Sequence, residues 1–272
     1  MQISLQTALI TGSSRGLGRA IAVKLAQERV KKIAVHYLSN KSEAEKTLAQ
    51  LRDAGADGVL IQGDTSNAQR AEEIVGEAAQ KLGGCDIFIQ SVVPRLEQIF
   101  EPVLATEVPL AKWQLAYDTQ ARAFFLGARA AAKHMTRGGR ILALSYTPGG
   151  VTGGWQPWVG MGSAKAALES MCRYFAVALA RDGITVNAVS PGVSDDTTLI
   201  GQTPQEVQDA LKDWACSGWT PMRRRVAPSD IANVCALLCS DEASFLTGQT
   251  LAVDGGSSLM NPDFPLALQV PK

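Results

Sequence analysis

A doubly wound α/β domain is the fold class that this sequence of 272 residues predicts. Three observations lead to it: short apolar runs alternate with longer helical patterns, a glycine-rich turn follows the first run, and no repeat or linker divides the chain. Strands joined by helices need right-handed crossovers, which build a parallel sheet covered on both faces. We therefore expect a single domain with about seven parallel strands.

The expected strands are short apolar or β-branched runs that helical patterns or turn signals separate. The first, TALI, precedes an amphipathic helical pattern, and the second, KIAVHY, precedes the pattern KSEAEKTLAQLRDAG. Later runs have the same character. The predicted strands are 7–10, 32–37, 57–62, 86–90, 140–145, 184–190 and 250–254.

Two long irregular segments break this alternation, at about 91–110 and 191–225, and both directly follow strands. Ligands of open α/β sheets bind beyond the carboxyl ends of the strands, so both segments are candidate walls of an active site. We expect residues 193–225 to form a substrate lid. Residues 1–260 then form the domain, and residues 261–272 form a C-terminal tail that packs on a neighbour or frays.

The charges of the chain balance, because 26 lysines and arginines face 26 aspartates and glutamates. No net charge therefore favours nucleic acid or an anionic membrane as a partner. No apolar stretch is long enough to predict a membrane span, and the N-terminus does not resemble a signal peptide. These features favour small-molecule chemistry.

Five cysteines form an odd set without a CxxC pair, and Cys235 and Cys239 stand one helical turn apart in an apolar run. Buried core thiols are typical of such a run. A zinc site would need further ligands, and the chain has only two histidines, His36 and His134. We therefore expect no metal site, and a reducing, cytoplasmic location.

A glycine-rich turn, TGSSRGLG, links the first strand to the following helix and places glycine at 12, 16 and 18. Glycine permits the tight turn and lets the backbone approach a pyrophosphate, whose charge the N–H groups at the start of the helix stabilise. Because the turn opens a strand–helix–strand unit, we expect it to bind a dinucleotide rather than to be merely structural.

The residues after the second strand predict which dinucleotide binds. An acidic residue there would select the free ribose of NAD, but the chain has Tyr37, followed by Ser39, Asn40 and Lys41. With Arg15 in the glycine turn, two cations and several hydrogen-bond donors replace the carboxylate. This pattern favours the 2′-phosphate of NADPH; the alternative is that Arg15 and Lys41 are ordinary solvated charges.

Together these motifs resemble the short-chain dehydrogenase/reductase family over nearly the whole chain. The glycine turn is similar to the family's TGxxxGxG loop, Ser145 to its catalytic serine, and Lys165 to its catalytic lysine. The resemblance implies a Rossmann domain over residues 1–260 and a nicotinamide cofactor. The cofactor-binding residues that it implies are Gly12, Ser14, Arg15, Gly16, Leu17 and Gly18 for the pyrophosphate, Asp64 and Thr65 for adenine, and also Gln90, Ser91, Val92, Lys165, Pro191, Gly192 and Val193.

The chain departs from the family pattern at specific positions. QSVV replaces the usual NNAG after the fourth strand, Thr119 stands where the family has a helix asparagine, and Met161 replaces the tyrosine of YxxxK. The sequence resembles more closely the divergent branch that contains enoyl-acyl carrier protein reductases. That branch carries a Ser-Tyr pair, here Ser145-Tyr146, and a YxxMxxxK motif, in which Trp158 replaces the tyrosine.

Trp158, Met161 and Lys165 are spaced so that they share one side of a helix. Met and Trp at this spacing commonly belong to a core, but a lysine beside them needs a partner such as a cofactor ribose. Methionine has no proton to give, and an indole N–H is too weakly acidic to transfer its proton. Three proton sources remain open: Tyr146, water relayed through Lys165, or chemistry that needs no strong acid.

Each route favours a different reaction. Reduction of a conjugated C=C bond creates an enolate, which Ser145, Trp158 and a ribose held by Lys165 can stabilise with hydrogen bonds, and iminium reduction needs no oxygen acid. Tyr146 directly follows Ser145, so in an alternating strand it points to the opposite face. Its alternative role is packing or lining the entrance.

The remaining clues concern substrate and assembly. Trp155, Trp158, Met161 and Trp214 lie in segments expected around the substrate and predict a bulky, hydrophobic small molecule, although subunit packing would also explain some of them. Members of the family are usually dimers or tetramers. The resemblance therefore implies a homo-oligomer such as a homotetramer, with apolar helices near 111–135 and 158–181 as candidate interfaces.

The sequence thus predicts an NADPH-dependent reductase of a hydrophobic carbonyl or conjugated C=C (enone or enoyl) substrate. Its candidate catalytic residues are Ser145, Tyr146, Trp158 and Lys165. Loss of the family's asparagine and tyrosine also fits a non-redox isomerase or cyclase on a cofactor-binding scaffold. A silent nucleotide sensor is a third alternative, but it would leave Ser145 and Lys165 without a reason to occur together.

Overall fold

The computed structural model describes residues 1–136, 138–146, 154–195, 200–203, 205–263 and 265–269. Within these ranges seven strands form one parallel sheet in the order β3-β2-β1-β4-β5-β6-β7, which confirms the predicted doubly wound α/β fold. The strands are β1 (Thr7–Ile10), β2 (Lys32–Tyr37), β3 (Asp57–Gln62), β4 (Ile87–Gln90), β5 (Gly139–Leu144), β6 (Ile184–Pro191) and β7 (Thr250–Val253). Every predicted run matches its strand to within one residue.

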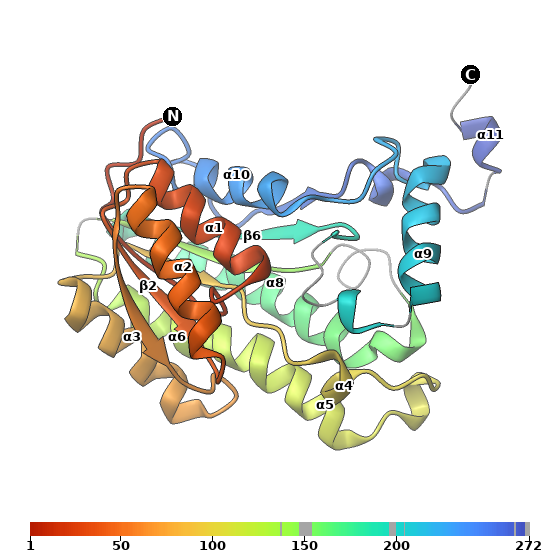
Figure 1. Cartoon of the computed structure of the whole chain (residues 1–272), viewed down its shortest axis with the longest axis horizontal. Helices are drawn as coiled ribbons and strands as arrows, with labels where there is room; N and C mark the ends of the chain where they lie inside the picture. Colours follow the sequence, from red (N-terminus) through yellow and green to blue (C-terminus); the bar gives the residue numbers. More distant parts are fainter. Residues whose placement is uncertain (137, 147–153, 196–199, 204, 264, 270–272) are drawn as a thin grey trace.

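Two helical layers cover the sheet (Figure 1). One face carries α1 (Gly16–Gln27), α2 (Lys41–Asp53) and α10 (Pro228–Cys239), and the other carries α3 (Ala68–Leu82), α6 (Ala123–Ala132) and α8 (Val159–Leu179). The other α-helices in the described ranges are α4 (Leu96–Ile99), α5 (Leu110–Tyr117), α9 (Gln205–Trp214) and α11 (Leu266–Gln269). A π-helical turn, Asp118–Arg122, joins α5 to α6.

Consecutive side chains of the central strands enter different cores. Ile10 and Ile89 lie in the core beneath α1 and α10, whereas Leu9 and Phe88 lie in the core beneath α3 and α6. All four are buried, and burial of such a side chain stabilises the fold by about 1.5–3 kcal/mol. Coverage of both faces explains why these strands are continuous apolar runs rather than alternating ones.

The sheet reverses its strand order between β1 and β4, because β2 and β3 lie on one side and β4 to β7 on the other. Ligands of such sheets bind at this switch point, beyond the carboxyl ends of the strands. The glycine turn follows β1, and the irregular segment that contains α4 follows β4. Both predicted ligand-binding segments therefore meet at the same place.

The predicted lid, residues 193–225, leaves the sheet after β6. A parallel bridge between Ser194 and Val226 closes its base, and α9 stands away from the sheet (Figure 1). Lid residues 196–199 and 204 lie outside the described residues. In the predicted tail, 261–272, α11 places Leu266 Cδ2 only 3.2 Å from where a Cβ on Gly218 of the lid would lie, so the tail packs on the lid. Tail residues 264 and 270–272 also lie outside the described ranges.

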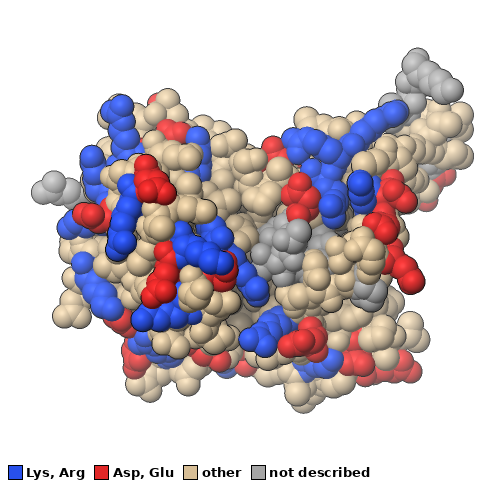
Figure 2. All heavy atoms as spheres, in the orientation of Figure 1, with Lys and Arg blue, Asp and Glu red and all other residues tan. Residues whose placement is uncertain are grey.

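Positive and negative side chains are interspersed on the face that Figure 2 shows. Within α3, Glu77 pairs with Arg70 (Oε2 to Nη2, 2.8 Å) and Lys81 (Oε1 to Nζ, 2.8 Å), so opposite charges also meet along one helix. This face therefore presents no broad surface of one sign. In the described ranges, the helices are all too short or too polar to cross a membrane.

The contact between α6 and β4 depends on a glycine. A Cβ on Gly127 would lie 2.4 Å from Cζ of the buried Phe88. We expect Gly127→Ala to lower the free energy of unfolding, because overpacking costs about 1–3 kcal/mol and exceeds the roughly 1 kcal/mol gained by removing a helical glycine. Urea unfolding measures the change.

The matched control is Gly76→Ala in the middle of α3, where no heavy atom lies within 4 Å of an added Cβ. There the helix-propensity gain stands alone, so we expect stabilisation by up to about 1 kcal/mol. Stabilisation by both substitutions would contradict the packing argument.

Candidate active site

The glycine turn has a backbone suited to an anion. Gly12 and Gly16 have φ angles of +67° and +59°, which favour glycine, and a Cβ on Gly18 would lie 2.4 Å from the Gly12 carbonyl oxygen. At the start of α1, Arg15 makes no side-chain capping bond, and the first turn contains no acidic residue. The exposed N–H groups of this helix end therefore fit a pyrophosphate.

A histidine that the sequence reasoning did not assign to the site anchors this turn. The Gly12 N–H donates to Nδ1 of buried His36 (3.0 Å), and the other ring nitrogen, Nε2, lies 3.1 Å from the Gly63 carbonyl oxygen after β3. Burial lowers the pKa of His36 to about 4. The ring is therefore neutral, with Nδ1 as acceptor and Nε2–H as donor. The sequence feature that could have indicated this role is a histidine within the apolar run KIAVHY.

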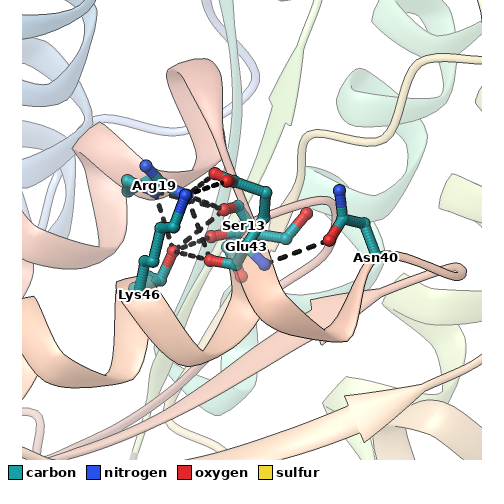
Figure 3. A network of polar contacts seen from close by, with 7 residues as sticks. Ser13, Arg19, Asn40, Glu43 and Lys46 are labelled. Atoms are coloured by element: carbon teal, nitrogen blue, oxygen red, sulfur yellow. Dashed lines mark hydrogen bonds and ion pairs between the residues drawn. The ribbon is translucent and has the colours of Figure 1, made fainter.

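A polar network joins α1 to α2 behind the glycine turn (Figure 3). Arg19 donates from Nε to the Ser14 carbonyl oxygen (3.1 Å) and from Nη2 to Glu43 Oε2 (2.6 Å), while Lys46 donates to Glu43 Oε1 (2.5 Å). Hydrogen bonds from Lys46 and Arg19 lower the pKa of Glu43 to about 2. Two cations thus compensate the negative charge of Glu43, which lies in the first turn of α2.

The residues predicted to select NADPH surround the carboxyl end of β2. Tyr37 is buried, whereas Arg15, Ser39, Asn40 and Lys41 are exposed. The Asn40 side chain caps α2 by accepting a hydrogen bond from the Glu43 N–H (3.1 Å). The Lys41 ammonium forms an exposed ion pair with Glu45 (3.7 Å), and such a pair contributes little energy. Both predicted cations therefore remain accessible to a phosphate.

The predicted adenine-binding pair follows β3. Thr65 is buried and Asp64 is exposed. Asp64 Oδ1 accepts hydrogen bonds from the N–H (2.8 Å) and the hydroxyl (2.7 Å) of Ser66. These bonds fix the carboxylate at the carboxyl end of β3, next to Gly63, whose carbonyl oxygen contacts His36.

Gln90 is the last residue of β4, and both ends of its side-chain amide form hydrogen bonds. Its Oε1 accepts from the Thr11 hydroxyl (2.9 Å), and its Nε2 donates to the Thr119 carbonyl oxygen (3.1 Å). The Ser91 N–H donates to the same Thr11 hydroxyl (3.1 Å). These bonds join the segment after β4 both to the glycine turn and to the π-helical turn.

Val92 brings that segment into direct contact with the phosphate-binding backbone. A Cβ on Gly12 would lie 3.0 Å from Val92 Cα and 3.2 Å from the Ser91 carbonyl oxygen. The predicted cofactor residues Ser91 and Val92 therefore lie against Gly12, which leaves no room for a larger residue in the turn.

Lys165 lies at the centre of the candidate catalytic group. It is 3% exposed, and its ammonium donates to Gln120 Oε1 (2.5 Å) and to the Leu144 carbonyl oxygen at the end of β5. Burial lowers its pKa to about 7, an effect that the charge of Glu169 opposes. An ammonium group has three donors, and the described residues satisfy two of them. One donor is thus available to a ligand such as a ribose hydroxyl.

Gln120, which the sequence reasoning missed, follows Thr119, the residue that stands where the family has a helix asparagine. Its Nε2 donates to the Val92 carbonyl oxygen (2.6 Å), while its Oε1 accepts from Lys165. The Thr119 hydroxyl instead bonds to the Leu115 carbonyl oxygen in its own helix. The side-chain amide that contacts Lys165 therefore lies one residue after Thr119, within a π-helical turn, whose spacing is wider than that of an α-helix.

Ser145 is the first residue after β5, and its N–H donates to the Val189 carbonyl oxygen (2.7 Å). Its hydroxyl donates to Oε1 of Glu169, a buried carboxyl group one helical turn beyond Lys165. Sequence reasoning also missed Glu169, although an acid on the apolar side of α8 was a usable signal. The structure thus groups Ser145, Lys165, Gln120 and Glu169.

Trp158 ends a 3₁₀ turn, Gln156–Trp158, that leads into α8, and it is buried beside Met161. The Tyr146 ring meets Trp158 edge-on at 6.1 Å between centroids, and Trp155 stacks on it at 5.5 Å. Within the described ranges, no acceptor meets the buried Nε1 of Trp158. A buried indole N–H normally has a partner, so this donor fits a ligand oxygen.

Of the other two predicted aromatic residues, Tyr146 belongs to this group and Trp214 does not. Burial raises the pKa of Tyr146 to about 12, which makes its phenol a poorer acid than an ordinary tyrosine. Trp214, at the end of α9, is 40% exposed, and no ring contact joins it to Trp155 or Trp158 in the part of the chain described. The structure therefore groups Tyr146, Trp155, Trp158 and Met161 and leaves Trp214 apart.

The start of the lid is fixed to its neighbours by backbone hydrogen bonds. β6 ends at Pro191, the Gly192 N–H donates to the Val253 carbonyl oxygen (3.1 Å), and the Val193 carbonyl oxygen accepts from the Val226 N–H (2.9 Å). These predicted cofactor residues therefore occupy a rigid position beside β7.

The cysteines are all free thiols, and Cys235 and Cys239 lie buried in the core beneath α10, as the apolar run predicts. In the described ranges, no three His, Cys, Asp or Glu side chains are grouped as metal ligands.

Acid is expected to destabilise the protein through His36. Its pKa falls from 6.5 to about 4 on folding, so between these values the unfolded chain binds a proton that the folded chain does not. Stability contributed by neutral His36 is present above pH 6.5 and declines as the pH falls towards 4, by about 1.4 kcal/mol per pH unit. Chemical denaturation at several pH values measures this slope.

His36→Gln should flatten the slope, because glutamine does not titrate. His134→Gln removes the other histidine and serves as the control for a histidine-to-glutamine change outside the glycine turn. Equal slopes in wild type and His36→Gln would contradict the role given to His36.

Comparison with known proteins adds to this geometry. Residues 12–258 match the family model described as enoyl-(acyl carrier protein) reductase. The chain is 37% identical over 268 residues to 1-cyclohexenylcarbonyl-CoA reductase of Streptomyces collinus, covering 95% of this chain and 89% of that protein. It is 31% identical over 253 residues to 3-oxoacyl-[acyl-carrier-protein] reductase of Staphylococcus aureus, covering 92% and 97%.

A solved structure agrees with these relatives. The angucycline C-6 ketoreductase LanV, solved with bound NADP, superposes with a TM-score of 0.82 at 28% identity, over 94% of this chain and 96% of LanV. The family resemblance predicted from the motifs is thereby confirmed. This chain belongs to the short-chain dehydrogenase/reductase family of oxidoreductases, through the branch that the enoyl-(acyl carrier protein) reductase model describes.

Proposed function

We propose that this protein is an NADPH-dependent reductase of a hydrophobic carbonyl or conjugated C=C substrate. Its proton donor is atypical, because Trp158 and Met161 stand where the catalytic tyrosine of the family would lie. The observation that carries the proposal is the buried Lys165, held by Gln120 and Leu144 at the end of β5. A buried cation is costly unless its hydrogen bonds are completed. A cofactor ribose would complete those of Lys165.

The choice of NADPH rests on charge. The glycine turn and the start of α1 would hold the pyrophosphate, while Arg15 and Lys41 would pair with a 2′-phosphate. Glu43 would otherwise repel that phosphate, but Arg19 and Lys46 compensate its charge. The bound NADP of LanV agrees with this choice. When bound, NADPH supplies the hydride.

The aromatic group favours a hydrophobic substrate beside Lys165. Tyr146, Trp155 and Trp158 contribute apolar area, and the indole Nε1 of Trp158 is a hydrogen-bond donor whose partner we assign to a substrate oxygen. The other donors that would stabilise negative charge there are the Ser145 hydroxyl and a ribose held by Lys165. Trp214 would line the lid side of the same substrate.

A conjugated C=C acceptor suits this site better than an isolated ketone. Hydride addition to the C=C bond leaves charge on an enolate oxygen, which hydrogen bonds stabilise without immediate proton transfer. The name of the Streptomyces collinus relative describes a substrate with a C=C bond beside a carbonyl, whereas that of the Staphylococcus aureus relative describes a 3-oxo group. We therefore favour an enone or enoyl substrate and retain the ketone as second choice.

A non-redox isomerase or cyclase is the alternative function. It is favoured by the residues at the two positions where the family's tyrosine could align. These residues are Trp158 and Met161, and neither side chain can transfer a proton. In that case the cofactor-binding scaffold would serve another reaction.

We also propose a homo-oligomer in a reducing, cytoplasmic setting. Phe125 of α6 is 41% exposed, and Tyr174 and Val177 of α8 are 77% and 81% exposed. Such large side chains on neighbouring helices suit a subunit interface. All five cysteines are free thiols, as a reducing compartment would keep them.

Lys165→Ala tests the proposed reductase. With NADPH and a panel of hydrophobic enones, ketones and imines, we expect wild-type turnover with at least one class, and a loss of kcat/KM of about 10²-fold or more in the variant. NADPH oxidation and product analysis measure both. Lys133→Ala, an exposed lysine after α6, is the matched control and should retain full activity.

Deuterium at C4 of NADPH separates the two functions. The label should appear in the product of a reductase and be absent from that of an isomerase. An unlabelled product, or a cofactor-bound wild type with no turnover of any class, would contradict the reductase proposal.

Arg15→Ala tests the choice of cofactor. Loss of a charge-assisted bond worth about 1.5–3 kcal/mol should raise the Kd for NADPH by roughly 10-fold or more. The Kd for NADH should hardly change, because NADH lacks the 2′-phosphate. Arg52→Ala at the far end of α2 is the control, and equal weakening of both cofactors by Arg15→Ala would point to damage of the turn instead.

A further inference from the structure

A pocket of about 460 Å³ lies where the lid meets the start of α10. Most of the residues that line it belong to the lid, and the rest to the segment that begins α10. Lys and Arg side chains gather, with a few acidic ones, over this part of the face that Figure 2 shows. The lining residues include neither the group around Lys165 nor any predicted cofactor residue. The proposed function therefore leaves this pocket without a role.

The charged side chains of the pocket are three cations, Lys212, Arg224 and Arg225, and two acids, Asp195 and Asp230. Arg224 donates to both carboxylate oxygens of Asp230 (2.5 and 3.1 Å), and the charge of Asp195 also acts on Arg224. Among the described residues, Lys212 and Arg225 form no ion pair with an acid. The pocket therefore keeps a positive charge, and two of its cations are available to an anion.

These donors approach the pocket from different elements. Lys212 lies on α9, Arg225 on the segment that joins α9 to α10, and Ser229 in the first turn of α10. A guanidinium group offers a fork of N–H donors, an ammonium group adds a point charge, and a serine adds a hydroxyl. Such a set suits the three free oxygens of a phosphate ester better than the two oxygens of a carboxylate.

The lid connects this pocket to the substrate. Trp214, which the proposed function places on the lid side of the substrate, lies between Lys212 and Cys216 in the chain, and both of these residues line the pocket. An anion bound to Lys212 would therefore also hold the part of the lid that carries Trp214. Binding energy from a remote part of a substrate can be used in this way to position its reacting end.

We propose that this pocket binds a phosphate group on an arm of the substrate, remote from the bond that is reduced. The inference rests on the proposed reductase function and deepens it. The substrate class becomes a hydrophobic conjugated acceptor joined to a phosphate-bearing arm. Arg225 and Lys212 bind the phosphate, and Arg224 remains paired with Asp230.

A pair of thioesters that differ only in the phosphate tests this assignment. Cinnamoyl-4′-phosphopantetheine has a conjugated C=C bond and a phosphate, whereas cinnamoyl-pantetheine lacks the phosphate. We expect the wild type to reduce the first with a kcat/KM about 10-fold higher or more, because charge-assisted hydrogen bonds are lost in the second. NADPH oxidation measures both rates.

Three variants accompany the two thioesters. Arg225→Gln and Lys212→Gln should each remove most of the preference for the phosphorylated thioester and leave the rate with cinnamoyl-pantetheine unchanged. Arg181→Gln, which changes an exposed cation in the turn after α8, is the matched control and should retain the preference. Equal rates with both thioesters in the wild type, or an unchanged preference in Arg225→Gln and Lys212→Gln, would overturn the inference.

Cys216 provides a measurement that does not depend on turnover. It lines the pocket and is exposed, whereas the other four cysteines are buried, so iodoacetamide should alkylate Cys216 first. With NADP⁺ at saturation to fill the dinucleotide site, S-acetyl-4′-phosphopantetheine should slow this alkylation at about 10-fold lower concentration than S-acetylpantetheine. Mass spectrometry of the alkylated peptide measures the rate. Arg225→Gln should abolish the difference, and Arg181→Gln should keep it.

The alkylation experiment separates the inference from the proposed function. Phosphate-dependent protection without turnover of any acceptor would contradict the reductase and support the pocket. Turnover with equal protection by the two acetyl compounds would support the reductase and overturn the pocket. Protection by inorganic phosphate at the same concentration as S-acetyl-4′-phosphopantetheine would assign the pocket to a free anion and overturn the substrate arm.

Discussion

The burial of one ammonium group, that of Lys165, is the constraint around which the carboxyl edge of the sheet is arranged. A cation in the interior must be surrounded by acceptors, because the protein cannot replace its lost hydration in any other way. The acceptors come from separate elements: a carbonyl oxygen at the end of β5 and an amide oxygen from the π-helical turn. The nearby charge of Glu169 on α8 adds electrostatic compensation. The ammonium group of Lys165 therefore helps to hold all three elements in place.

The π-helical turn connects this charge to the phosphate side of the site. Gln120 joins Lys165 to the backbone of Val92, Val92 lies against Gly12, and the Gly12 N–H is bonded to His36. One continuous set of contacts thus runs from the candidate catalytic lysine to the glycine turn. A dinucleotide spanning these two regions would meet a surface that was already ordered before binding, which lowers the entropic cost of binding.

The sequence was sufficient to predict the strands, the glycine turn and the positions of Ser145 and Lys165, because each depends on local composition or on spacing within one segment. It was insufficient for His36, Gln120 and Glu169. Their roles arise from contacts between residues 24 or more positions apart, such as His36 with Gly12, Gln120 with Lys165, and Glu169 with Ser145. The amide that contacts Lys165 also lies in a π-helical turn, one residue after Thr119, and a pattern read with ordinary helical spacing does not reveal such a turn. A polar residue within an otherwise apolar pattern was a usable signal for His36 and Glu169.

The Ser145 hydroxyl has a single proton, and this sets the chemistry that the site supports. When Ser145 donates to Glu169, it presents only lone pairs to a substrate, and the Trp158 Nε1 is the donor left for an oxygen there. An enolate is stabilised by hydrogen bonds and tolerates delayed protonation, so a conjugated C=C acceptor would suit this arrangement. An alkoxide is far more basic and would need a proton that the Ser145 hydroxyl, which donates to Glu169, does not supply. The direction of one buried hydrogen bond is therefore the reason to prefer a conjugated substrate to an isolated ketone.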